Sequence, residues 1–128
     1  MIQQDFIIVC ESAMITEGSK NLNLFGIFEY MSAPGVPVIH PKFCVVTKFE
    51  GGEGEHSHDI IIRYEATKEE IAKLKGKIVF SPNKKAQYIG TFIGFPFKNF
   101  GKYIIEIYVD DILQPLVESI NVIPEEKK

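Results

Sequence analysis

The chain has 128 residues, which is an ordinary size for one domain. Hydrophobic residues make up 45% of it and charged residues 24%, a balance typical of globular proteins and not of disordered ones. The formal net charge is -3, and Arg63 is the one arginine. Without a positive field or arginine forks for phosphate, we expect no nucleic-acid partner.

Hydropathy and the N-terminal sequence predict the compartment. No stretch approaches the roughly 20 apolar residues of a membrane span, so we expect no membrane partner. The start MIQQDFIIVCES has no basic region, and Glu11 interrupts its short apolar run. We therefore predict a cytoplasmic protein. Cys10 and Cys44 sit in apolar runs and are interpreted as reduced core residues, with a disulfide between neighbouring strands as the alternative.

Alternation of apolar and polar residues predicts strands over residues 5–15, 22–31, 42–50 and 58–66. Gly26 lies inside the second of them and indicates a bulge or a point of close approach. The segment SAPGVPVIHP at residues 32–41 contains three prolines. Proline cannot donate to a sheet ladder, so we predict a long surface connection there that crosses between sheets.

The segment TKEEIAKLKG predicts a short helix near residues 68–75. Thr67 can cap it, Glu70 completes a capping box, and Gly76 supplies the stop. Ile71 and Leu74 would form a narrow apolar edge on an otherwise solvent-facing helix.

The rest of the chain predicts strands over 77–81, 86–95, 102–110 and 113–123, and a frayed tail over 125–128. The resulting fold class is all-β. We predict one domain over residues 1–128, an immunoglobulin-like, two-sheet antiparallel β-sandwich with one short connecting helix. A barrel with a similar number of strands is the alternative.

The segment GEGEHSHDI is a candidate metal site. His56 and His58 would share one face of a strand, and His40 or Glu53 could supply a third ligand. The alternative is a hydrophilic hairpin loop, which the glycines favour. We expect no bound cofactor.

The segment FIGFPFKNFGKY concentrates aromatic residues around a proline. Pro96 places its strand at a sheet edge or at the strand's end. Phe95, Phe97 and Phe100 are therefore candidates for an exposed interaction surface, and burial between the sheets is the alternative that we favour.

Two acidic residues, Asp110 and Asp111, are predicted to form a tight hairpin turn. Together with Glu118 they could instead surround calcium. Motifs for nucleotide binding, serine hydrolysis or zinc proteolysis do not occur in the sequence. We therefore predict no catalytic residue and favour a noncatalytic protein.

Two stretches, SKNLNLFGIFEYM and FGKYIIEIYVDDILQPLVESINV, resemble a family of short bacterial β-sandwich proteins of unknown function. The family pattern has an LNLxGxF strand, a proline-bearing loop and a late GxYxxxIxVD hairpin. The matching residues are Lys20, Leu22, Asn23, Leu24, Gly26, Phe28, Gly101, Tyr103, Ile107, Val109, Asp110, Leu113, Pro115 and Leu116. Ser19 and Asp111 depart from the pattern. The resemblance implies a fold and a bacterial cytoplasmic setting, and it carries over no catalytic residue.

These observations favour a noncatalytic protein-interaction, structural or accessory module whose partner is another protein or a second copy of the chain. The alternative is a metal-binding or small-ligand-binding protein centred on His56 and His58. A carbohydrate or lipid binder is a third hypothesis, which no sequence pattern supports.

Overall fold

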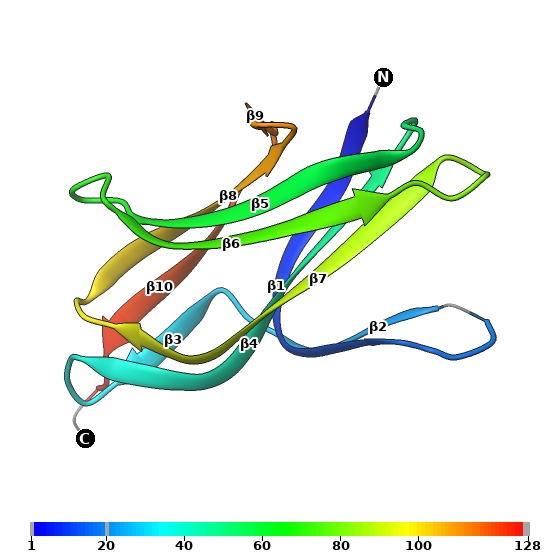
Figure 1. Ribbon diagram of the computed structural model, residues 1–128. Helices are drawn as coiled ribbons and strands as arrows, with labels where there is room; N and C mark the ends of the chain where they lie inside the picture. Colours follow the sequence, from blue (N-terminus) through cyan, green and yellow to red (C-terminus); the bar gives the residue numbers. More distant parts are fainter. Residues whose placement is uncertain (1, 20, 127–128) are drawn as a thin grey trace.

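The computed structural model describes residues 2–19 and 21–126. In this part of the chain the regular structure consists of strands, without any helix (Figure 1). The strands are β1 (Gln3–Ile15), β2 (Leu22–Ile27), β3 (Tyr30–Ala33), β4 (Val38–Glu50), β5 (Glu55–Tyr64), β6 (Glu70–Val79), β7 (Lys85–Phe97), β8 (Gly101–Val109), β9 (Ile112–Leu113) and β10 (Glu118–Pro124). Lys20 and the last two residues of the predicted frayed tail lie outside the described residues.

The strands form two sheets. One has the order β2-β1-β4-β7, and the other has the order β3-β10-β8-β5-β6, with the short β9 pairing with β8. Neighbouring strands are antiparallel except β3, which runs parallel to β10. No ladder joins the two sheets within the described residues, so the barrel alternative is wrong. The predicted all-β class with two sheets is confirmed.

One hydrophobic core lies between the sheets, because alternate side chains of the central strands face the opposite sheet. Its fully buried members include Phe43 and Val45 on β4, Ile60 and Ile62 on β5, and Ile105 and Ile107 on β8. Burial of each such side chain stabilises the fold by roughly 1.5–3 kcal/mol. Loss of any of these residues is therefore costly.

The helix predicted near residues 68–75 is wrong. Thr67 accepts a hydrogen bond from the amide of Glu69 (3.3 Å), but the chain then turns through Lys68 (φ 64°) and enters β6. In β6 the side chains of Ala72, Leu74 and Ile78 face the core at every second position. The alternation of these apolar residues outweighs the capping signals. Burial of the apolar side chains against the other sheet stabilises a strand by more than a single cap would stabilise an isolated helix.

Gly76, predicted to end the helix, lies inside β6. A Cβ atom there would collide with the Tyr88 ring of the opposite sheet, so the glycine allows the two sheets to approach. Gly26 has a similar role in β2: its φ is 69°, and a Cβ atom would lie 2.6 Å from a Glu11 carboxylate oxygen. The predicted close approach at Gly26 is confirmed.

The connection formed by the proline-bearing segment is shorter than we predicted. It crosses between the sheets as expected, but the connection covers residues 34–37, and β4 already begins at Val38. Ile39 and His40 pair with Pro96 and Phe95 of β7. Prolines are tolerated here because they stand at the ends of strands and because β7, where Pro96 lies, is an edge strand as predicted.

The first residue of the predicted frayed tail is held in place. The amide of Glu125 donates a hydrogen bond to the carbonyl oxygen of Ala33 (2.9 Å), which ties residue 125 to the end of β3. The sequence gives no signal for this parallel contact, because it joins segments far apart in the chain.

Tyr103 fixes the corner at which the chain passes from β7 to β8. Its ring is buried against Phe97 and Tyr64. Its hydroxyl donates to the carbonyl oxygen of Asn99 (3.0 Å) and accepts from the amide of the same residue (3.2 Å). Both backbone groups of the corner are therefore satisfied by one side chain.

We predict that Tyr103→Phe lowers the free energy of unfolding by about 1–3 kcal/mol, because the Asn99 groups lose their partner while the ring remains. Urea denaturation measures the change. Tyr30→Phe is the control, since Tyr30 is exposed and no hydrogen bond involves its hydroxyl in the described structure. Equal effects of the two substitutions would contradict the role of the Tyr103 hydroxyl.

Candidate functional site

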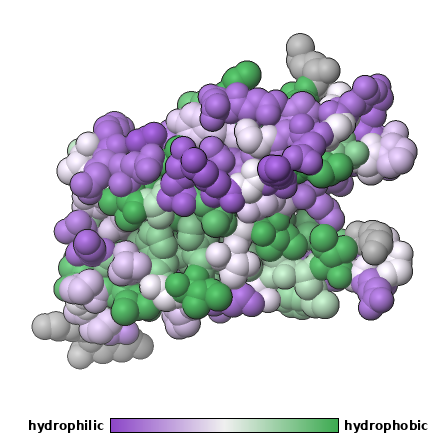
Figure 2. Space-filling model, viewed as in Figure 1, coloured by the Kyte–Doolittle hydropathy of each residue, from purple (hydrophilic) through white to green (hydrophobic). Residues whose placement is uncertain are grey.

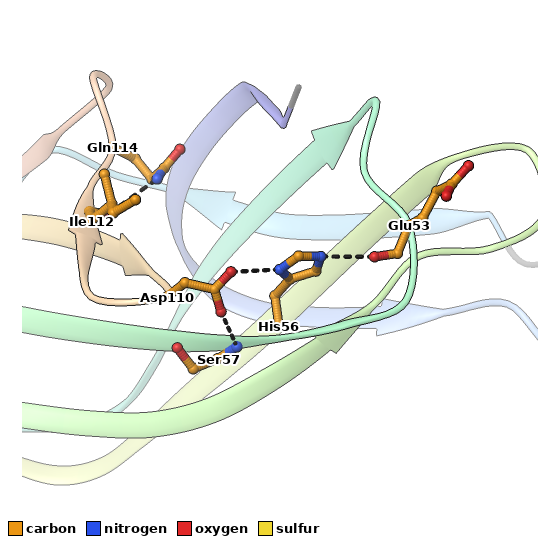
Figure 3. A network of polar contacts seen from close by, with 6 residues as sticks. All are labelled: Glu53, His56, Ser57, Asp110, Ile112 and Gln114. Atoms are coloured by element: carbon orange, nitrogen blue, oxygen red, sulfur yellow. Dashed lines mark hydrogen bonds and ion pairs between the residues drawn. The ribbon is translucent and has the colours of Figure 1, made fainter.

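The candidate site lies at one end of the two sheets, where the turn before β5 meets the turn between β8 and β9 (Figure 3). His56 stands near the start of β5, between these turns. Its Nδ1 donates to Oδ2 of Asp110 (2.6 Å), and its Nε2 donates to the carbonyl oxygen of Glu53 (2.8 Å). Oδ1 of Asp110 accepts from the amide of Ser57 (3.1 Å). Each polar atom of this network thus has a partner.

The geometry defines the charge of His56. A carboxylate and a carbonyl oxygen only accept hydrogen bonds, so both ring nitrogens must carry a proton, which makes the side chain an imidazolium. Consistently, the hydrogen bond to Asp110 raises the pKa of His56, and the same bond lowers the pKa of Asp110. In this state His56 has no lone pair to offer a metal ion.

Asp110 reaches His56 because of the turn that carries it. Asp110 and Asp111 have φ values of 51° and 65°, as the two central residues of a type I′ hairpin turn require. The predicted turn is therefore present. Glu118, the third residue of the calcium alternative, lies on β10, where its carboxylate accepts from the amide of Ser119 (2.9 Å). Asp110 and Glu118 therefore bind different groups, on different strands.

His58 lies two residues further along β5 on the same face, but it is buried in the core. Its Nε2 is 2.8 Å from the hydroxyl of Thr47, and its ring packs against Tyr88 (centroids 4.3 Å apart) and Phe49. Desolvation lowers the pKa of His58 to about 4, so the side chain is neutral at pH 7. His58 is a core residue with one hydrogen bond.

His40, the predicted third ligand, is not near the other two. It stacks on Phe28 (centroids 5.3 Å apart), and its Nδ1 accepts from the amide of Lys42 (3.2 Å). Burial lowers the pKa of His40. Within residues 2–19 and 21–126, no group of three or more His, Cys, Asp or Glu side chains is placed to hold a metal ion. The predicted three-histidine site has no geometric support.

The aromatic stretch lies between the sheets. Phe95 and Phe97 are buried, with Phe97 in contact with Phe43 and Tyr103, and Phe100 packs against the same core. These rings are therefore not a surface patch, and the core interpretation is the right one. The reason is that Phe95 and Phe97 lie on the face of β7 that points to the other sheet, where Phe97 meets Tyr103 of β8.

Cys10 and Cys44 face each other on β1 and β4 as free, buried thiols. Burial raises the pKa of Cys10. A thiol with a raised pKa and no solvent access is a poor nucleophile, so the pair fits the predicted packing role.

A surface that we did not predict adjoins the His56 network. It consists of four large apolar side chains, Ile112, Leu113, Leu116 and Val117, which are 66%, 48%, 39% and 49% exposed. We call this surface the apolar tip. A shallow depression beside it is lined by Ile2, Val109, Asp110 and Pro115. The sequence signal was the run ILQPLV directly after a turn, since so many adjacent apolar residues cannot all face a core.

The apolar tip is held in a fixed shape. The side-chain amide of Gln4 donates to the carbonyl oxygen of Leu116 (3.2 Å) and accepts from its backbone amide (2.7 Å). The amide of Gln114 donates to the carbonyl oxygen of Ile107 (2.8 Å). Together with the Asp110 network, these bonds order the segment on both sides.

Fold and site together define an all-β, two-sheet protein with a polar network and an exposed apolar tip at one end. Over residues 5–119 the chain matches a family of unknown function (DUF6941), and it belongs to that family. This confirms the resemblance to an uncharacterised family. No curated protein matches the chain. In the described residues no helix is long and apolar enough to cross a membrane.

We predict that Asp110→Asn lowers the pKa of His56 toward 6.5, because the carboxylate that stabilises the imidazolium is replaced by a neutral amide. An NMR titration of the histidine ring protons measures it, with Asp111→Asn as the control in the same turn. In the wild-type protein the raised pKa stabilises the fold below pH 6.5, and this contribution is lost as the pH rises through the pKa of folded His56. An unchanged pKa in Asp110→Asn would contradict the imidazolium assignment.

His58 has the opposite linkage to pH. Its pKa is about 4 when folded, whereas the unfolded value is near 6.5, so the unfolded state binds the proton first. Stability should fall between pH 6.5 and 4, by roughly 3 kcal/mol over the whole interval. We predict that His58→Gln, which does not titrate, removes this part of the pH dependence. Urea denaturation at pH 7.5 and 4.5 measures it, and parallel losses in both proteins would refute the prediction.

Proposed function

We propose that this protein is a noncatalytic interaction or accessory module that binds another protein through its apolar tip. The observation that carries the proposal is the combination of high exposure and fixed shape at Ile112, Leu113, Leu116 and Val117. Exposed apolar patches rimmed by polar groups are typical of protein-binding surfaces. A preorganised surface also loses less conformational entropy when it binds.

The state of the histidines supports a noncatalytic role. His56 is already a paired cation and His58 is a buried neutral side chain, so neither offers a free base or a free ligand. The alternative of a metal held by these two residues would require His56 to give up one of its two hydrogen bonds and the proton on that nitrogen, and His58 to leave its buried position. We therefore favour the interaction module over the ligand-binding protein.

We also propose that the two sheets form a sandwich of the immunoglobulin type. The order β1-β4-β7 corresponds to strands A, B and E of that fold, and β10-β8-β5 corresponds to G, F and C. Tyr103 supports this assignment, since a tyrosine that bonds upstream backbone at the start of strand F is a feature of immunoglobulin-type domains. Such domains commonly bind partners through the loops at one end.

The proposed setting is the bacterial cytoplasm. The family resemblance of the two sequence stretches points to bacteria. The free thiols of Cys10 and Cys44 support a reducing compartment, because they face each other across adjacent strands without forming a bond.

We predict that Ile112→Asp combined with Leu113→Asp weakens partner binding, because two charges would have to be buried in an apolar interface. The immobilised wild-type protein is used to recover its partner from an extract of the source organism, and the purified pair is then measured by calorimetry. Binding should weaken by at least about tenfold, which is 1.4 kcal/mol.

Ile39→Asp is the matched control, since Ile39 is 63% exposed and lies at the start of β4, away from the apolar tip. It should bind like the wild type. A partner that binds the double variant equally well, or recovery of nothing but this chain itself, would overturn the proposal.

A further inference from the structure

The free edge of β7 has features that the apolar tip does not share. β7 is the outermost strand of its sheet. Among the described residues it pairs only with β4. Residues 86–97 contain no charged side chain. Natural proteins commonly protect a long edge with charges, because an unprotected edge invites another strand.

The other three edges are protected or short. On β6, lysines stand at positions 73, 75 and 77 along the edge. β3 has four residues, and β2 has six with a positive φ at Gly26 that bends it. Figure 2 shows a related contrast: hydrophilic residues predominate in the upper part of the view, where β5 and β6 lie in Figure 1, and hydrophobic residues in the lower part, which the C-terminal end of β7 reaches.

The register of β4 and β7 shows which backbone groups are free. The amide of Gly51 donates to the carbonyl oxygen of Lys84 (2.9 Å), so these residues form a hydrogen-bonded pair. Hydrogen-bonded pairs alternate along an antiparallel ladder. Gln87, Ile89, Thr91 and Ile93 therefore turn their N–H and C=O groups to the open edge.

The same residues place their side chains on the outer face of the sheet. Ile93 is 80% exposed, the highest value among the large apolar residues of the described chain, and Ile89 is half-buried beside Val46. Thr91 lies midway between these two isoleucines and is also exposed.

We propose that two copies of this chain pair antiparallel through β7, with the twofold axis at Thr91. This register places Thr91 opposite its own copy and Ile89 opposite Ile93 of the second copy on both sides of the axis. Each pair exchanges its backbone hydrogen bonds, and the exposed isoleucines become cross-strand neighbours.

Charge selects a second copy as the occupant. In a twofold pair centred on Lys75, Lys73 would lie opposite Lys77 of the second copy and Lys75 opposite its own copy, so the edge of β6 would repel itself. The uncharged β7 edge has no such penalty and is complementary to itself. The dimer lies on a surface separate from the apolar tip, so it goes beyond the proposed function, and either can fail without the other.

The test is the mass in solution, measured by light scattering after gel filtration at about 100 µM, where a dimer with a micromolar Kd is formed almost completely. We expect the wild type to have twice the chain mass. Ile93→Lys should have the mass of one chain, because it replaces the side chain that lies opposite Ile89 of the second copy with a charged one, at a position that the fold leaves exposed. Ile112→Lys, the matched control at the apolar tip, should remain a dimer.

Cross-linking tests the register independently of stability. Cα atoms of a hydrogen-bonded pair lie about 5.5 Å apart, which suits a disulfide. Because Sγ of Cys44 lies 3.6 Å from Oγ1 of Thr91 in the same chain, the variants are made in a Cys44→Ala background, which removes the competing thiol. With oxidised glutathione as the oxidant, Thr91→Cys should form a covalent dimer, whereas Ile112→Cys and Cys44→Ala alone should not.

A monomeric wild type at this concentration would overturn the proposal. So would a dimer that withstands Ile93→Lys, a dimer that Ile112→Lys dissociates, or Thr91→Cys that does not cross-link. Circular dichroism and thermal melting of Ile93→Lys show whether its fold is retained. If it is lost, the wild-type mass and the Thr91→Cys cross-link decide the question.

Discussion

Burial of the isoleucine rows of β5 and β8 against the phenylalanines of β4 is the constraint on which the rest of the structure depends. It fixes which face of each central strand points inward, because a shift of one residue would expose the whole row. The polar and functional features then follow from position along these strands. His56 and Asp110 emerge where β5 and β8 reach the end of the core, and the apolar tip begins where β8 turns back.

The pair of histidines on β5 illustrates how depth determines chemistry. His56 and His58 share one face and differ by a single strand repeat. One lies at the rim beside a carboxylate and is charged, whereas the other lies between aromatic rings and is neutral. A sequence pattern gives the shared face but not the depth. The metal hypothesis arose from the pattern, and the difference in depth removes its geometric basis.

Much of the fold was predictable because period-two alternation is a local signal. The strands of the central sheets, the close approach at Gly26, the edge position of Pro96 and the Asp110–Asp111 turn could all be read from neighbouring residues. The helix prediction was wrong because Thr67 and Glu70 match the pattern of a helix cap. Gly76 looked like a helix stop, but it is a glycine because the Tyr88 ring of the other sheet leaves no room for a side chain, and that ring lies far away in the sequence. The apolar tip was missed because exposure depends on which segments cover a residue, and the Gln4 bonds to Leu116 join opposite ends of the chain.

The parallel pairing of β3 with β10 has a consequence for how the chain folds. Tyr30 is aligned with Asn121, so β3 reaches its partner strand only after nearly the whole chain is available, whereas β1 pairs with β2 and β4 much earlier. Such long sequence separations slow folding, since the entropy of closing a large loop is lost before the contacts form. During synthesis β7, which is uncharged from Ala86 to Phe97, leaves the ribosome before β10, so its core face stays incompletely covered until the last strand completes the opposite sheet.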